Sequence, residues 1–154
     1  VHRLRQRYPR AWLVYRAEIV SPSEALARLQ DPDFDAYRTA LIERAPSIPL
    51  AQGATGGTAQ YLARGPEYLA LAVEAGANGL LVLSEVYYPG WRATVDGQEV
   101  PVLRANYSLR AVAVPAGSHT VEWRYDPWTC KAGLVISLTS LVVLLAGLVL
   151  ADHR

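Results

Sequence analysis

Residues 79–100 read GLLVLSEVYYPGWRATVDGQEV, and the order of residue types in this stretch decides the fold class. Short runs rich in β-branched and aromatic residues are separated here by residues typical of turns. Pro89-Gly90 separates the first two runs, and Asp96-Gly97 is typical of a type I′ hairpin turn. We therefore predict three strands, at residues 79–86, 91–95 and 98–104.

The stretches on either side continue this pattern. Apolar runs bounded by turn residues recur roughly every ten residues, which favours a sandwich of two sheets. In the last run Val121, Trp123 and Tyr125 alternate with polar residues, so one face of that strand packs inward. We expect a mainly antiparallel β-sandwich over residues 8–127, with further strands at 58–64, 67–74, 107–114 and 118–125.

The N-terminal part adds one helix to this β-rich pattern. A strand is predicted at residues 11–20, and a short helix follows near 22–30. Ser21 can cap this helix, Pro22 suits its first position and Glu24 completes a capping box. A further strand is expected at 38–43, and the basic residues 1–7 are interpreted as a linker that precedes the domain.

The C-terminal part is a long run without charge. Residues 132–151 contain no Asp, Glu, Lys or Arg. As a helix, such a run spans roughly 30 Å, the thickness of the hydrocarbon core of a bilayer. We predict a transmembrane helix at 132–151, whose membrane-interface residues are Trp123, Tyr125, Trp128 and Lys131.

Composition limits the functional classes. The chain has 154 residues, a formal net charge of +1, one cysteine and no methionine. The near-neutral charge argues against a nucleic-acid surface, and a lone cysteine permits no internal disulfide. Because the chain lacks methionine and a signal peptide, we expect it to be a fragment whose beginning lies upstream.

No catalytic or metal constellation is predicted, and no cofactor is expected. Asp31, Asp33 and Asp35 alternate as in a calcium loop, but Ala36 and Ile42 replace the glycine and the glutamate that such a loop needs. The three histidines have no partners at a useful spacing in the sequence. A surface hydrolase remains an alternative if the fold brings a histidine beside a serine or a carboxylate.

One aromatic and polar group is the best candidate for binding. Aromatic faces can stack on sugar rings, while arginine and asparagine can bond hydroxyl or pyrophosphate groups. The alternative is that these residues belong to the core or to corners of the sandwich. The candidate residues for binding sugar or polymer are Tyr87, Tyr88, Trp91, Arg104, Asn106 and Tyr107.

Several motifs occur in an order that resembles one family. They are Val82-Leu83-Ser84-Glu85, Tyr87-Tyr88-Pro89-Gly90-Trp91, Val95-Asp96-Gly97, Arg104-Ala105-Asn106-Tyr107 and the run from Val114 to Val121, followed by the apolar helix. In this order they resemble the C-terminal end of the YfhO family of bacterial multi-pass membrane proteins. Those proteins are similar in architecture to lipid-linked glycosyltransferases of the GT-C type.

This resemblance implies a bacterial cell-membrane protein with many upstream helices and an extracytoplasmic C-terminal β-domain. It also implies a polyprenyl-linked sugar donor, a cell-envelope acceptor and catalytic acidic residues in upstream loops. The chain itself is then a non-catalytic accessory domain with the last transmembrane helix, in contact with the bilayer and the upstream helices. The alternative is a membrane-anchored carbohydrate-binding or adhesion module without transferase activity.

Overall fold

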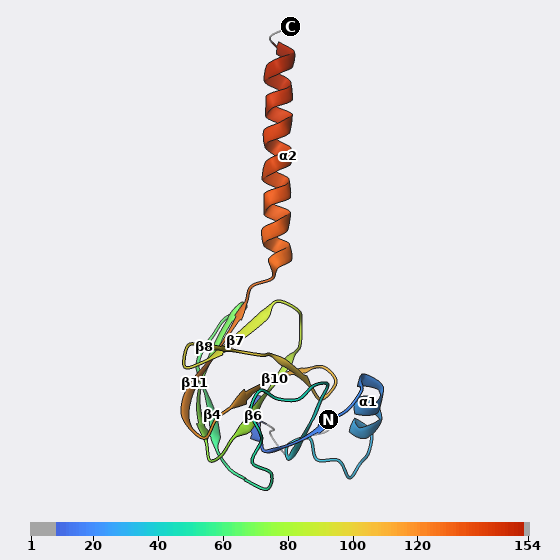
Figure 1. Ribbon diagram of the computed structural model, residues 1–154, viewed down its shortest axis with the longest axis vertical. Coiled ribbons are helices and arrows are strands. Elements are labelled where there is room, and N and C mark those ends of the chain that lie inside the picture. Colours follow the sequence, from blue (N-terminus) through green and yellow to red (C-terminus); the bar gives the residue numbers. More distant parts are fainter. Residues whose placement is uncertain (1–8, 153–154) are drawn as a thin grey trace, which may run out of the picture.

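The computed structural model describes residues 9–152. Two β-sheets pack face to face, and one long helix projects from one end of this body (Figure 1). The predicted linker at residues 1–7 lies outside the described residues. The chain is therefore mainly β with one short helix in the body, as the sequence pattern predicts.

The first sheet has six strands in the order β1-β6-β10-β9-β3-β2. Its neighbours are antiparallel except for β2 and β3, which run parallel. Pairing in the sandwich is thus mainly antiparallel, as the sequence analysis predicted, with one parallel pair that it did not predict. The strand bounds are β1 Ala11–Val14, β2 Arg16–Ile19, β3 Thr39–Ile42, β6 Gly79–Val86, β9 Leu103–Ala105 and β10 Leu109–Val114.

The second sheet has five strands in the order β4-β5-β11-β7-β8, and all its neighbours are antiparallel. Asp96 and Gly97 join β7 to β8 with φ angles of 51° and 80°. Positive φ at both central residues agrees with the predicted type I′ turn. The bounds are β4 Thr58–Arg64, β5 Tyr68–Ala75, β7 Trp91–Val95, β8 Gln98–Val100 and β11 Gly117–Tyr125.

The first part of strand β6, up to Leu83, is buried on both of its faces. Leu81 and Leu83 belong to the core between the two sheets, which also contains Trp123. Leu80 and Val82 belong to a second core on the opposite face of the first sheet, where the partly buried Tyr37, Ile48 and Leu50 pack against them. Burial on both faces explains why residues 80–83 of this strand are continuously apolar instead of alternating.

Helix α1, Pro22–Leu29, has the predicted start. The Ser21 side chain accepts a hydrogen bond from the Glu24 backbone, and the Glu24 carboxylate accepts one from the Ser21 backbone. This reciprocal capping box satisfies two backbone donors that a helix start would otherwise leave open. Helix α1 and its flanking loops connect β2 to the parallel β3.

Helix α2, Trp128–Asp152, starts four residues before the predicted span. The hydroxyl groups of Thr139 and Ser140 donate to the carbonyls of Val135 and Ile136, at 2.8 and 2.9 Å. Among the described residues we find no helix whose length and hydropathy together reach what a membrane crossing requires. The helix is thus present where it was expected, whereas its transmembrane character stays a prediction.

Two predicted strands are divided in the structure. The predicted strand 11–20 breaks at Tyr15, which is buried, donates its hydroxyl to the Gly56 carbonyl at 2.8 Å and accepts from the Gly76 amide at 3.2 Å. The predicted strand 98–104 ends at Val100 and resumes at Leu103, because Pro101 has no N–H for a ladder.

Candidate functional site

The turn after β6 packs against the linker that leads into α2. The Asp126 amide donates to the Gly90 carbonyl at 2.8 Å. Gly90 has a φ of 106°, and a Cβ placed there would lie 3.0 Å from the Cβ of Pro127. A side chain at Gly90 would therefore be strained and would collide with the linker. The rings of Tyr88 and Trp91 both lie against that of Tyr125, in the strand that precedes this linker.

Four exposed apolar side chains belong to the end of β6, the turn after it, the turn between β9 and β10, and the start of α2, and we call them the base patch: Val86, Tyr88, Tyr107 and Trp128. Tyr88 is 61% exposed and Trp128 is 75% exposed. The Tyr87 amide donates to the Ser108 carbonyl at 2.6 Å, which holds the turn containing Tyr107 beside the end of β6. Exposed aromatic side chains beside an apolar helix are typical of a membrane interface.

The predicted sugar-binding residues are not all available at the surface. The Arg104 guanidinium lies 5.0 Å from the centre of the Tyr87 ring and 3.2 Å from Glu43. Asn106 is buried, has a φ of 46°, and exchanges hydrogen bonds of 2.9 and 2.7 Å with the Leu41 backbone. Asn106 therefore joins the β9–β10 turn to β3, while Tyr88 and Tyr107 remain on the surface.

The predicted membrane-interface residues also separate. Trp123 is fully buried between the sheets, so its ring is in the core and not at a bilayer surface. Tyr125 is half-buried, with its ring centre 5.3 Å from that of Trp91 and 6.4 Å from that of Tyr88. Trp128 is exposed, and the side chain of Lys131 lies outside the described part of the structure.

A buried arginine lies where the sequence analysis expected only a strand. The Arg110 guanidinium is 3.8 Å from the ring centre of Trp91 and 5.3 Å from that of Trp123. It pairs with Glu85, whose carboxylate also meets Arg64 at 3.2 Å. Burial lowers the pKa of Arg110, and the nearby carboxylate opposes that effect. The sequence contains a signal for this pair that the sequence analysis did not use: an arginine within the otherwise apolar run of β10 needs a buried carboxylate partner.

His119 has a carboxylate partner that its sequence spacing did not reveal. Its Nδ1 lies 2.6 Å from Oδ2 of Asp96, and its Nε2 lies 3.2 Å from the carbonyl oxygen of Ala116. The fold thus brings a histidine beside a carboxylate, as the hydrolase alternative requires. However, both ring nitrogens already have acceptors, so the ring has no free nitrogen with which to activate a nucleophile.

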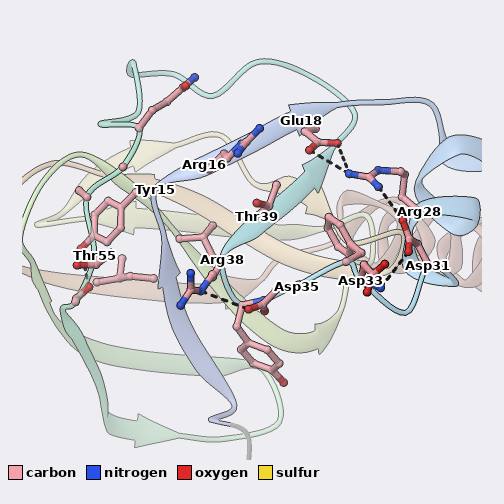
Figure 2. A pocket seen from close by; sticks show the side chains of 18 residues that line it. Tyr15, Arg16, Glu18, Arg28, Asp31, Asp33, Asp35, Arg38, Thr39 and Thr55 are labelled. Atoms are coloured by element: carbon pink, nitrogen blue, oxygen red, sulfur yellow. Dashed lines mark hydrogen bonds and ion pairs between the residues drawn. The ribbon is translucent and has the colours of Figure 1, made fainter.

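A polar cleft with a volume of about 940 Å³ is lined by none of the residues predicted for binding. Figure 2 shows its lining, which comes from residues 13–18, Arg28, and the segments 31–39 and 52–56. Arg28 pairs with Glu18 at 3.4 Å and with Asp31 at 3.2 Å. The sequence analysis missed this cleft because each segment on its own reads as a strand end or a polar turn.

The three alternating aspartates shape one wall of the cleft. Asp31 accepts a hydrogen bond from the Asp33 amide at 3.0 Å, and Asp35 accepts one from the Tyr37 amide at 2.9 Å. These are local side-chain-to-backbone bonds of the kind that form Asx turns. Within residues 9–152, no group of three or more potential His, Cys, Asp or Glu ligands is arranged to hold a metal ion.

Comparison with protein families gives one match. Residues 67–137 match the family described as bacterial membrane protein YfhO. This part of the chain is a YfhO-family region. It runs from the start of β5 into α2 and contains the Glu85–Arg110 pair and all four residues of the base patch, whereas the residues that line the cleft lie before it. No curated protein and no solved structure matches the chain. The YfhO match supports a location in a bacterial membrane.

Proposed function

We propose that this chain is the extracytoplasmic C-terminal domain of a multi-pass membrane protein, together with its last transmembrane helix. The parent protein would resemble transferases that use lipid-linked sugars to glycosylate cell-envelope polymers. The observation that carries the proposal is that the YfhO-family region continues without a break from the second sheet into α2. This match supports treating the strands from β5 to β11 and the start of α2 as parts of one family region.

The position of α2 supports the role of a membrane anchor. The helix leaves one end of the sandwich and extends away from it as a single rod (Figure 1). Residues 132–151 are uncharged, and the described side chains of Leu134, Ile136 and Val143 are more than half exposed. Exposed apolar side chains along an isolated helix need an apolar surrounding, which a bilayer or neighbouring helices would provide.

The accessory role fits the chemistry of the sandwich. The Glu85 carboxylate is shared by two arginines, and His119 is held at both ring nitrogens. Groups engaged in this way stabilise the fold and are poorly placed to act as a general base. In this proposal the sandwich braces the membrane part or holds the acceptor polymer, and upstream loops carry the catalysis.

The polar cleft favours a second candidate function, a membrane-anchored carbohydrate-binding module without transferase activity. The cleft lies outside the YfhO-family region and could serve a parent protein of either kind. The sequence upstream of Val1 separates the two candidates. Ten or more apolar spans would support the transferase-linked protein, whereas a signal peptide directly before Val1 would support the anchored module.

Topology labelling tests the proposed arrangement. In a parent protein otherwise free of cysteine, Gln98→Cys places a thiol on the exposed β8 and His153→Cys places one beyond the uncharged run. A membrane-impermeant maleimide should label Gln98→Cys in cells stripped of their wall, and should label His153→Cys only after the membrane is opened. The reverse pattern, or equal labelling of both positions in intact cells, would overturn the proposal.

Truncation provides a separate test of the accessory role. A chain ending at Pro127 should fold as a soluble β domain, because both cores are formed by residues before that point. It should transfer no sugar from a lipid-linked donor. Transfer by this truncated chain would contradict a non-catalytic role.

A further inference from the structure

We propose that the cleft lined by residues 13–18, 31–39 and 52–56 binds an uncharged saccharide. The proposal deepens the proposed function, on which it rests for the expectation that the cleft faces the cell envelope. It assigns acceptor binding to the N-terminal half of the sandwich and not to the aromatic group at residues 87–107.

The size of the cleft suits a short oligosaccharide. Its volume of about 940 Å³ is at the upper end of the range of about 300–1,000 Å³ typical of small-molecule sites. In Figure 2 the charged groups around Arg28 lie at one end of the cleft, and Tyr15 with Thr55 at the other. A ligand of several rings can therefore meet different donors and acceptors along its length.

The charges that line the cleft nearly balance. Arg16, Arg28 and Arg38 oppose the four carboxylates of Glu18, Asp31, Asp33 and Asp35. A site for a phosphate-rich polymer or a nucleotide needs an excess of positive charge, which this lining lacks. A site for a lipid chain needs a mainly apolar wall. An uncharged ligand rich in hydroxyl groups fits such a lining best.

The ion pairs hold their members in place and leave lone pairs for a ligand. Arg28 joins Glu18 to Asp31, and Arg38 lies 3.5 Å from Asp35. Each ionised carboxylate has about four acceptor positions, so one ion pair does not exhaust them. Sugar hydroxyls can donate to these oxygens and accept from the guanidinium groups.

Other side chains of the lining are free to bond a ligand. The guanidinium of Arg16 and the carboxylate of Asp33 have no ion-pair partner among the described residues. Both residues are exposed at the cleft, as is Gln52. A cation, an anion and an amide together supply donors and acceptors in the mixture that a polyol requires.

Two aromatic rings contribute apolar faces. Phe34 and Tyr37 are half-buried in the wall formed by residues 31–39. The guanidinium of Arg28 lies 5.1 Å from the centre of the Phe34 ring, and the Tyr37 ring centre lies 4.8 Å from that of Trp12. These contacts hold both rings in place, so a sugar ring can pack on them with little loss of side-chain entropy.

The loop that forms the opposite wall is held at both ends. The Ala51 amide donates to the Asn78 carbonyl at 2.9 Å, and the Tyr15 hydroxyl donates to the Gly56 carbonyl at 2.8 Å. Gly53 lies between these points with a φ of 90°, and a Cβ added there would meet no atom within 4 Å. The backbone at this position is therefore open to a ligand that approaches closely.

Titration of the full chain in lipid nanodiscs tests the proposal. Amide chemical shifts are followed while maltotriose or chitotriose is added as a neutral probe, and glycerol 3-phosphate or spermidine as a charged probe. We expect saturable shifts within residues 31–39 and 52–56 for a neutral trisaccharide, and weaker binding of both charged probes. An absence of saturable shifts there with both trisaccharides, or tighter binding of a charged probe, would overturn the proposal.

Two pairs of variants locate the binding. Asp33→Asn should weaken trisaccharide binding about tenfold, because a hydrogen bond to a charged group is lost. Its control is Glu67→Gln, which removes a carboxylate from an exposed turn outside the cleft. Gln52→Ala should weaken binding about threefold or more, and Gln60→Ala on β4 is its control. Equal effects in a variant and its control would exclude binding at the cleft.

A nanodisc exposes both faces of the bilayer, so the trisaccharide can reach the cleft whichever side of the membrane it faces in cells. The binding result is therefore independent of the labelling result. Binding with reversed labelling would retain the saccharide site and overturn the extracytoplasmic assignment. Correct labelling without binding would retain the topology and overturn the site.

Discussion

His119 is held between two acceptors, with its Nδ1 2.6 Å from Oδ2 of Asp96 and its Nε2 3.2 Å from the Ala116 carbonyl oxygen. A ring that donates from both nitrogens is the protonated imidazolium. The hydrogen bond to Asp96 accordingly raises the pKa of His119, and the bond from His119 lowers the pKa of Asp96. Asp96 also accepts from the Thr120 amide at 2.7 Å, so the pair fastens the β7–β8 hairpin to β11.

The His119–Asp96 pair should make the free energy of unfolding fall both when the pH rises and when it falls. Because the pKa of His119 is raised in the folded chain, its contribution is full below the unfolded value of about 6.5 and is lost as pH rises through the folded pKa. Because the pKa of Asp96 is lowered, its contribution is present above about 3.9 and is lost as pH falls through the folded pKa. Urea unfolding at a series of pH values measures both limbs.

The control for this pH dependence is His119→Gln, which should remove the loss of stability on the alkaline side. Asp96→Asn should return the pKa of His119 toward its ordinary value in an NMR titration. A His119 pKa that stays the same in Asp96→Asn would show that the observed hydrogen bond is not the cause.

Replacing Glu85 should destabilise the fold more than replacing its partner Arg110. Glu85→Ala leaves a buried guanidinium without its carboxylate, and should lower the free energy of unfolding by about 3–5 kcal/mol. Arg110→Met should cost less, because a flexible apolar side chain can fill the space between Trp91 and Trp123, while Glu85 keeps Arg64. Chemical denaturation of each variant gives the comparison.

Arg64→Ala is the matched control, since it removes the other arginine from the same carboxylate. Half of the Arg64 side chain is exposed, so this change should cost no more than about 1 kcal/mol. An effect of Arg64→Ala as large as that of Glu85→Ala would show that the buried member of the network is not the important one.

Asn106 combines a special backbone conformation with a long-range hydrogen bond, and substitutions can separate the two. Asn106→Gly tolerates the φ of 46° but removes the bond to the Leu41 amide, which should cost about 1–3 kcal/mol. Asn106→Ala removes the same bond and adds roughly 1–2 kcal/mol of backbone strain. Thermal unfolding should therefore rank wild type above Asn106→Gly, and Asn106→Gly above Asn106→Ala. The opposite order of the two variants would contradict the strain argument.

Alanine substitutions of Tyr88 and Trp123 should differ in their effect on stability, because the first residue is on the surface and the second is in the core. Tyr88→Ala changes an exposed side chain and should alter the free energy of unfolding by no more than about 0.5 kcal/mol. Trp123→Ala empties a fully buried position and should cost about 3–5 kcal/mol. Denaturant titration checks both, and a large destabilisation by Tyr88→Ala would mean that its ring belongs to the core.

Much of the β pattern could be predicted because its signals are local. The strands at 58–64, 79–86 and 91–95, the Ser21 capping box and the Asp96-Gly97 hairpin all agree with the structure. The parallel pairing of β2 with β3 was missed because the break at Tyr15 depends on partners at Gly56 and Gly76, far along the chain. The break at Pro101, in contrast, had a local signal.

The sites were harder to predict because they are assembled from distant segments. Asn106 looked like a ligand-binding amide, yet its partner is the Leu41 backbone 65 residues away. The cleft draws on three separated segments whose polar residues each suit an ordinary turn. Trp123 was predicted for the membrane interface from its residue type and its position before the apolar run, although the alternation within β11 placed it on the inward face, where the structure buries it.

The fastening of Gly90 to the linker has a mechanical consequence. Asp126 is bonded to the Gly90 carbonyl and Pro127 is packed against the same residue, so α2 begins directly after a clamped point. Because this linker is held in place, the sandwich would rotate together with α2 when the helix tilts, whereas a flexible linker would let the two move independently. Helix α1, whose last turn carries the cleft residue Arg28, lies apart from α2 at the side of the body (Figure 1), so a tilt of α2 would move the cleft together with the sandwich.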